Sequence, residues 1–249
     1  MKKKEVGLAS LTLYNQFYNI SSDNSNNKVS IKWINGITYE YTIPNGYYSI
    51  SDLNTFLQNK MIIDKLYLIK NSDKNVYFVE LLVDANKYGS TINTYVVPTS
   101  TEMLSYQWTK PSNSSHWDLP NTSTAPQIIF NSKFGKLLGF EGGTYPSTIQ
   151  YVDVQSENTL TPEISVVNSL IFRCNLINNI NISPTDCLRS MGIKKSFGDQ
   201  MEIGGGYILY SDISTNIYNQ IELTICDQNL KPIKLIDTDC TIILSIKNK

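Results

Sequence analysis

Few side chains in this sequence have the types and spacing that catalysis needs. The single histidine, His116, lies in a polar segment rich in serine, threonine and asparagine. A nucleophilic triad that contains histidine would have to use this residue, and no Gly-x-Ser-x-Gly motif positions a serine for one. We therefore interpret His116 as a solvated surface residue, and we predict that the chain has no catalytic residues and is not an enzyme.

The cysteines do not have the spacing of a metal site. Cys174, Cys187, Cys226 and Cys240 form no Cys-x-x-Cys pair, and one histidine excludes any site that needs two. Cys174 and Cys226 lie in apolar runs of β type, where a free thiol packs as a small apolar side chain. We expect four reduced cysteines, and no metal or cofactor site.

Two further patterns fall short of a catalytic or phosphate site. The run Gly204-Gly205-Gly206 has no Lys-Ser or Lys-Thr ending, so it predicts a turn or bulge between strands and not a phosphate-binding loop. A glycosidase needs two facing carboxylates, and no compact acidic cluster marks such a pair. An enzyme is the weaker hypothesis.

Composition excludes other function classes. Of 249 residues, 21 are basic and 22 are acidic, so the net charge is −1 and lacks the field of a dedicated nucleic-acid binder. Only 17% of residues are charged, while 16 are tyrosine, a balance that suits close packing between subunits. An A/T-rich genome would produce a similar bias. No apolar stretch is long enough for a membrane helix, and the start lacks the apolar block of a signal peptide.

The termini carry most of the clustered basic charge. Lys2, Lys3 and Lys4 lie at one end, and Lys247 and Lys249 at the other. Such lysines suit a weak contact with nucleic acid, and they also suit simple solvation, which we prefer slightly.

The elements that position these residues are mainly strands. Residues 28–34 and 37–43 alternate apolar and polar side chains on either side of Asn35-Gly36, whose two residues tolerate positive φ. This pattern predicts a β-hairpin. Further strand-like runs cover 11–18, 66–70, 76–83, 91–97, 164–177, 207–210, 217–226 and 241–246.

Helices are few, and one long loop is expected. A helix is predicted after Ser49, with Leu53, Phe56 and Leu57 on one face, and another after Asn131, ending at Gly139. Residues 108–126 contain several prolines and many small polar residues, as in a functional or mobile loop. We predict an all-β, antiparallel β-sandwich with a few short connecting helices and long loops. It forms one domain over 1–249, with 98–126 as a long exposed loop or small insertion.

Several segments, taken in order, resemble the minor capsid, or penton, proteins of virophages and Polinton-type elements. The segments are LTLYN at 11–15 with YNI at 18–20, IPNGYYSISDLN at 43–54, KLLGF at 136–140, IFRCNLI at 171–177 and IELTICDQ at 221–228. The loop at 108–126 has no counterpart in this pattern.

The resemblance implies a single jelly roll that acts as a structural capsid protein. A homopentamer would fill the five-fold vertices of an icosahedral virus-like particle, beside a double jelly-roll major capsid protein. The protein would then belong to the virion, assembled in the host cell interior. A second function class stays open, namely a receptor- or carbohydrate-binding β-sandwich such as a spike or lectin-like head. Trp108, Trp117 and the many tyrosines would suit stacking on sugars equally well.

Overall fold

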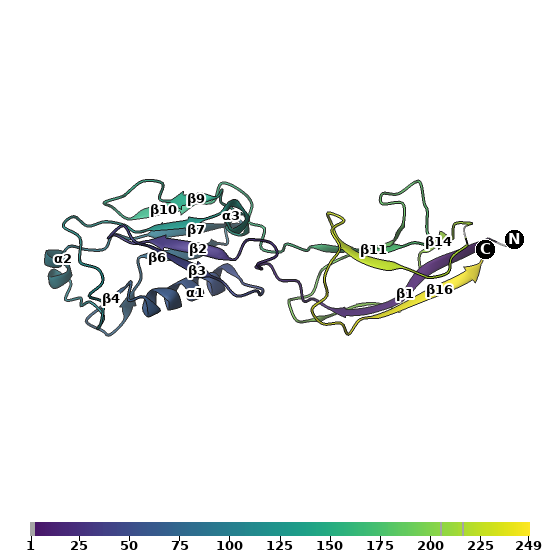
Figure 1. The fold of residues 1–249 in the computed structure, drawn as a ribbon, viewed down its shortest axis with the longest axis horizontal. Coiled ribbons are helices and arrows are strands. Elements are labelled where there is room, and N and C mark those ends of the chain that lie inside the picture. The colour runs from purple at the N-terminus through teal and green to yellow at the C-terminus, as the bar shows by residue number, and fades with distance from the viewer. Residues whose placement is uncertain (1–2, 205, 216) are drawn as a thin grey trace. The chain divides into compact units, whose positions relative to one another are not determined.

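The structure is a computed structural model that describes residues 3–204, 206–215 and 217–249 (Figure 1). Every pairing between its strands is antiparallel, and three helices accompany the described strands. The predicted antiparallel all-β class with few helices is confirmed. Lys2 and Gly205 lie outside the described residues, so the interpretations that involve them are not addressed by the structure.

The contacts divide the chain into two compact units, where the sequence had indicated one domain over 1–249. Unit 1 comprises Met1–Phe17 and Ser165–Lys249, and unit 2 comprises Tyr18–Ile164. Unit 2 is therefore inserted in the sequence of unit 1. No Gly- or Pro-rich linker marks either junction, which is why the sequence shows no boundary there.

Unit 1 contains two sheets that share one apolar core. Strand β1 is central in the first sheet, with β16 on one edge and β13 and β14 on the other, and β11 is central in the second, between β12 and β15. The strands are β1 Lys4–Tyr14, β11 Ser169–Cys174, β12 Cys187–Gly192, β13 Gln200–Ile203, β14 Tyr210–Asp212, β15 Leu223–Asp227 and β16 Thr241–Asn248.

A bulge sets which residues of β1 reach this core. The register between β1 and β16 shifts between Leu8 and Ser10. Because strand side chains alternate between faces, the inserted residue lets Val6 and Leu8 before the bulge, and Leu11 and Leu13 after it, all be buried. They pack in one cluster with the inward side chains of β11, including Phe172 and Cys174.

Unit 2 has two larger sheets and a two-stranded ladder. Their orders are β3-β2-β8-β9, β10-β7-β6 and β4-β5. The strands are β2 Lys28–Lys32, β3 Thr38–Thr42, β4 Leu68–Ile69, β5 Asn75–Val76, β6 Val79–Asp84, β7 Gly89–Thr94, β8 Gln127–Phe130, β9 Gly143–Tyr145 and β10 Val154–Glu157.

The predicted hairpin is present, with a different turn. Strands β2 and β3 pair from Lys28↔Thr42 to Lys32↔Thr38. Of the two turn residues, only Gly36 has a positive φ, at 81°. The side chain of Asn35 instead accepts a hydrogen bond from the Ile37 amide, at 3.0 Å, which closes the turn without positive φ at Asn35.

Both predicted helices form, and a third begins the segment 98–126. Helix α1 (Ile50–Ile63) starts at a capping box of Ser49 and Asp52 and packs on β6, as Figure 1 shows. Helix α3 (Ser132–Leu138) ends at Gly139 in the left-handed conformation. Helix α2 (Ser100–Ser105) was not predicted, although Thr99 and Glu102 form a second capping box.

The segment 98–126 also differs from a long exposed loop. Trp117 is only 2% exposed, and its indole Nε1–H donates to the Lys65 carbonyl at 3.0 Å. Its ring packs edge-on against Trp33, with centroids 5.3 Å apart. The segment is therefore anchored in the core of unit 2, because an aromatic side chain this large is stabilised by burial once its N–H has a partner.

Several strand limits differ from the sequence pattern. The runs 164–177 and 217–226 form only the shorter strands β11 and β15, and β14 begins where the run 207–210 ends. The apolar runs continue beyond the strands, where Leu176 and Ile177 are buried but Ile217 and Ile221 are exposed, so apolar composition alone overestimates strand length. Among the described helices, none combines the length and apolar character required to cross a membrane.

Candidate functional site

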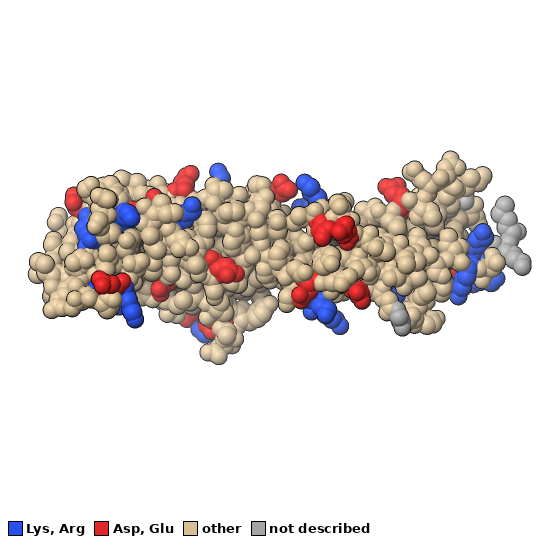
Figure 2. Space-filling model, turned by 90° about the horizontal axis from the view of Figure 1, so that it is seen from below, with Lys and Arg blue, Asp and Glu red and all other residues tan. Residues whose placement is uncertain are grey.

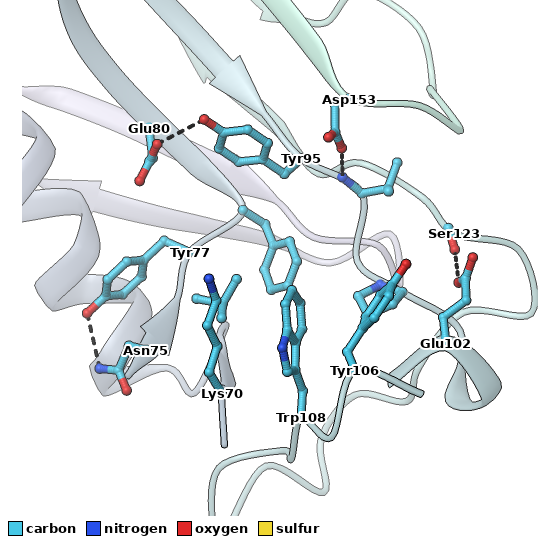
Figure 3. A pocket seen from close by; sticks show the side chains of 14 residues that line it. Lys70, Asn75, Tyr77, Glu80, Tyr95, Glu102, Tyr106, Trp108, Ser123 and Asp153 are labelled. Carbon is cyan, nitrogen blue, oxygen red and sulfur yellow. Dashed lines mark hydrogen bonds between the residues drawn. The ribbon is translucent and has the colours of Figure 1, made fainter. Parts of the chain in front are cut away.

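A pocket of about 480 Å³ lies in unit 2, where the ends of several strands meet α2. Figure 3 shows the lining side chains. Aromatic rings, carboxylates and a single lysine line it. The lining residues are Lys70, Asn75, Val76, Tyr77, Phe78, Glu80, Tyr95, Val96, Pro98, Glu102, Tyr106, Trp108, Ser123 and Asp153.

Trp108 and Tyr106 form an aromatic wall of this pocket. They follow α2, and their ring centroids are 5.1 Å apart at an interplanar angle of 47°. The Trp108 amide donates to the Met103 carbonyl at 3.0 Å, which fixes the backbone where the chain leaves the helix. The ammonium of Lys70 lies over the Trp108 ring, 5.7 Å from its centroid (Figure 3).

Glu102 is held by the start of its own helix. One carboxylate oxygen, Oε2, accepts hydrogen bonds from the Thr99 amide and the Thr99 hydroxyl, both at 2.8 Å, and from the Ser123 hydroxyl. The Ser123 hydroxyl, followed by the Thr99 groups, lowers the pKa of Glu102 below its usual value. The side chain is therefore ionised at neutral pH.

Two further carboxylates are positioned by the strands. Asp153, just before β10, accepts from the Val96 amide at 2.8 Å. Glu80 on β6 accepts from the Tyr95 hydroxyl at 3.1 Å. Burial raises the pKa of Tyr95, and the negative charge of Glu80 adds to the effect, so the phenol stays protonated and donates.

Chemically, the arrangement is suited to binding. Aromatic rings offer apolar faces, while Glu80, Glu102, Asp153 and Lys70 offer acceptors and one donor. Within the described part of the chain, no cluster of three or more histidine, cysteine, aspartate or glutamate side chains could hold a metal ion.

The residues singled out in the sequence analysis lie in different environments in the structure. Trp108 lines the pocket, but its expected companion Trp117 is buried in the core. His116 is exposed and contacts Tyr39 edge-on, with ring centroids 6.4 Å apart. Gly204 follows β13, in the connection to β14, but the turn predicted over Gly204-Gly205-Gly206 includes Gly205, which lies outside the described residues.

Most of the pocket was missed by reasoning from the sequence. Glu80 lies on β6, while Tyr77, Tyr95 and Asp153 lie just outside strands β5, β7 and β10, and no spacing in the chain marks the four as one site. One signal was present: the Thr-x-x-Glu pattern that ends at Glu102 is typical of a capping box and indicates the helix that borders the pocket.

All four cysteines are free thiols in the structure. Cys174 and Cys226 are buried on the adjacent strands β11 and β15, as the sequence predicted. Burial raises the pKa of Cys174, Cys187 and Cys240, so these thiols are poor nucleophiles at neutral pH.

A second candidate site is the apolar surface of unit 1. Ile217 is 95% exposed, and Ile180 and Tyr207 are each 84% exposed. On β16, Ile243 and Ile246 also face solvent. Charged side chains are sparse on the face of the molecule in Figure 2. Exposed apolar side chains of this size are typical of protein contact surfaces where they lie together in one patch.

The terminal lysines are brought together by strand pairing. Because β1 and β16 are antiparallel, Lys4 lies opposite Asn248. Lys247 pairs with Glu5 at 3.3 Å, and Lys249 pairs with Asp212 at 2.9 Å. These exposed ion pairs partly neutralise the basic cluster that the sequence had indicated.

Similarity to known proteins is found in structure and not in sequence. No protein-family model matches this chain, and no curated protein matches it in sequence. Among solved structures it is similar to the mavirus penton protein, with 12% identity and a TM-score of 0.44 over 100% of this chain and 86% of that one. It is also similar to a chain of the Sputnik virophage, with 11% identity and a TM-score of 0.34 over 98% and 87%.

Proposed function

We propose that this chain is a structural capsid protein that forms the pentameric vertices of an icosahedral particle. The observation that carries the proposal is the strong exposure of large apolar side chains in unit 1, where Ile180, Tyr207 and Ile217 are almost fully accessible. Burying such side chains against neighbouring subunits removes apolar surface from water, which favours assembly. Many assemblies could use such a surface. The ordered sequence motifs that resemble penton proteins favour a capsid vertex.

The motif residues support a structural role, because they build the framework of each unit. The side chain of buried Asn19 donates to the Tyr48 carbonyl and accepts from the Tyr48 amide, each at 2.8 Å. Gly139 ends α3, and Phe172 lies in the core of unit 1. Asp227 accepts from the amides of Asn229 and Lys231 in the turn after β15. These positions hold the fold and line no reactive centre.

A ring of five subunits needs two different lateral patches on each copy, because the contact is heterologous and closes by rotation. Unit 1 offers distinct surfaces for this purpose. Its sheets end in β16 on one side and in β12 or β15 on others. The outer edge of β15 is partly covered by the segment that follows it, through a bridge between Cys226 and Pro232, while no further strand pairs with the outer edges of β12 and β16 among the described residues. Edge strands and exposed isoleucines together suit lateral packing.

The resemblance supplies the remaining parts of the proposal. The partners are four further copies of the chain and a double jelly-roll major capsid protein around the rim. The protein resides in the virion after assembly in the host cell interior. Lys4, Lys247 and Lys249 at one end of the β1–β16 pair supply a weak contact with the genome, reduced by the ion pairs of Lys247 and Lys249 with Glu5 and Asp212.

The decisive experiment is a reconstruction of intact particles that carry the full chain. We expect density for this chain at the five-fold vertices. Ile217→Asp places a charge on the proposed contact surface, so its incorporation into vertices should fall strongly. Ile63→Asp, on an exposed isoleucine of α1, is the matched control and should assemble normally. Absence of the chain from the vertices overturns the assignment, and equal incorporation of both variants overturns the contact surface.

A further inference from the structure

The pocket of unit 2 is a feature that the proposed shell contacts of unit 1 do not explain. Its residues belong to unit 2 and include Trp108, Tyr106, Tyr77 and Tyr95, which are polar-tipped aromatic side chains around one cavity. A volume of about 480 Å³ lies within the usual range for sites that enclose small molecules. It accommodates one or two sugar rings.

The aromatic wall offers a stacking surface. Trp108 and Tyr106 are adjacent, with ring centroids 5.1 Å apart and planes tilted by 47°. Neither ring is buried in the core, and Trp108 lines the cavity. One face of a pyranose ring consists of C–H groups, which pack on an aromatic face while the hydroxyls point outward.

The carboxylates around the cavity are already oriented. In Glu80, Glu102 and Asp153, one oxygen is held by a hydrogen bond from the protein. Among the described residues, the other oxygen of each side chain accepts no hydrogen bond. An acceptor that is fixed through one oxygen loses little freedom when a ligand hydroxyl donates to the other.

The charge balance selects the class of ligand. Three carboxylates face one ammonium, that of Lys70, so an anionic ligand is repelled. A cationic ligand stacked on Trp108 would lie beside the Lys70 ammonium, whose nitrogen is 5.7 Å from the ring centroid, and would be repelled by it. A neutral polyol avoids both conflicts, because its hydroxyls donate to carboxylates and accept from Lys70 and Asn75.

We propose that this pocket binds a neutral saccharide, with Trp108 and Tyr106 as the stacking surface. Glu80, Glu102 and Asp153 accept hydrogen bonds from its hydroxyls, and Lys70 donates to them. A structural capsid protein with such a site would attach to a neutral glycan. The proposal does not depend on the five-fold assembly, because every residue named lies in unit 2 of a single chain.

Tryptophan fluorescence provides a direct measurement on the full chain. Of the three tryptophans, Trp33 and Trp117 are each only 2% exposed, so a ligand in the pocket changes mainly the emission of Trp108. The probes are the methyl glycosides of glucose, galactose, mannose and N-acetylglucosamine. The methyl glycoside of sialic acid is the anionic comparison, and tetramethylammonium is the cationic one. We expect saturable binding of at least one neutral glycoside at millimolar concentrations, and none of either charged probe.

Variants test the assigned residues by calorimetry, which does not depend on Trp108 as a reporter. Tyr106→Ala and Trp108→Ala should each weaken binding roughly tenfold, as expected for the loss of one aromatic contact. Tyr88→Ala removes a tyrosine of unit 2 that is 76% exposed and lies outside the pocket, so its affinity should be unchanged. Unaltered far-UV circular dichroism verifies that each variant is folded.

Three results would overturn the proposal: no binding of any neutral glycoside, binding of a charged probe in preference to all of them, or equal affinity of Trp108→Ala and Tyr88→Ala. Each is independent of the particle reconstruction, so this site can fail while the vertex assignment stands.

Discussion

Tyr41 joins a strand to the end of a helix through one buried hydroxyl. It lies on β3, is buried, and donates to the Asp64 carboxylate at 2.8 Å, where Asp64 caps the C-terminus of α1. Burial raises the pKa of Tyr41, and the hydrogen bond to Asp64 and its negative charge raise it further. The phenol is therefore favoured in its neutral form by the fold.

This contact predicts a loss of stability in alkali. Because the folded pKa of Tyr41 lies above the unfolded value of about 10, its contribution is complete below pH 10 and is lost as the pH rises further. Tyr41→Phe should cost about 1 kcal/mol at neutral pH through the missing hydrogen bond. The difference from the parent protein should shrink above about pH 10, as measured by urea unfolding across that range.

Tyr88→Phe is the control, since Tyr88 is exposed and its substitution should leave the free energy of unfolding unchanged at every pH. A difference between Tyr41→Phe and the parent that stays constant through the alkaline range would contradict this role for Tyr41.

At the scale of elements, two glycines have the same backbone conformation but different steric surroundings. Gly36 in the β2–β3 turn has φ of 81° and Gly139 at the end of α3 has φ of 80°. A Cβ at Gly36 would meet nothing within 4 Å, whereas at Gly139 it would lie 2.4 Å from the Leu160 carbonyl oxygen. The Gly139 carbonyl accepts from the amides of Thr159 and Leu160, so the backbone there cannot easily move away.

The pair makes a matched test. Gly36→Ala should cost only the left-handed strain, about 1–2 kcal/mol. Gly139→Ala should cost more than Gly36→Ala, because a steric clash with backbone is added to the same strain. Thermal unfolding of both variants measures the difference. Equal shifts of Tm would show that the contact with Leu160 does not constrain the end of α3.

At the scale of the whole molecule, the chain leaves and re-enters unit 1 at neighbouring points of unit 2. Asn19, at the start of unit 2, donates to the carbonyl of Ile164, at its end, at 3.1 Å. Unit 2 is thus continuous in sequence and closed on itself. Unit 1 is discontinuous, and its central strand β1 comes from the opposite end of the chain to its other strands.

This topology predicts unequal behaviour of fragments. Residues 18–164 should fold alone, because their core and sheets need no strand from unit 1. Residues 165–249 should remain unfolded alone, because without β1 the strands β13, β14 and β16 lose their common partner. The dispersion of amide signals in NMR spectra tests both. A folded 165–249 fragment would contradict the central role of β1.

The sequence by itself determined the features that have local causes. The alternation around Asn35-Gly36, the cap at Ser49 and the stop at Gly139 each depend on residues within a few positions, and each is present in the structure. The antiparallel all-β class followed from the same local periodicity. The ordered motifs that resemble penton proteins were also readable in the chain alone.

Only the tertiary structure decided the features that depend on contacts between distant residues. The division into two units follows from the pairing of β1 with β16, more than 200 residues apart in the chain, which no local pattern encodes. Trp108 and Trp117 have similar polar neighbours in sequence, yet one lines a pocket and the other is buried. The carboxylates of that pocket come from separate elements. Burial and proximity are properties of the packed chain, because they depend on which surfaces exclude water together.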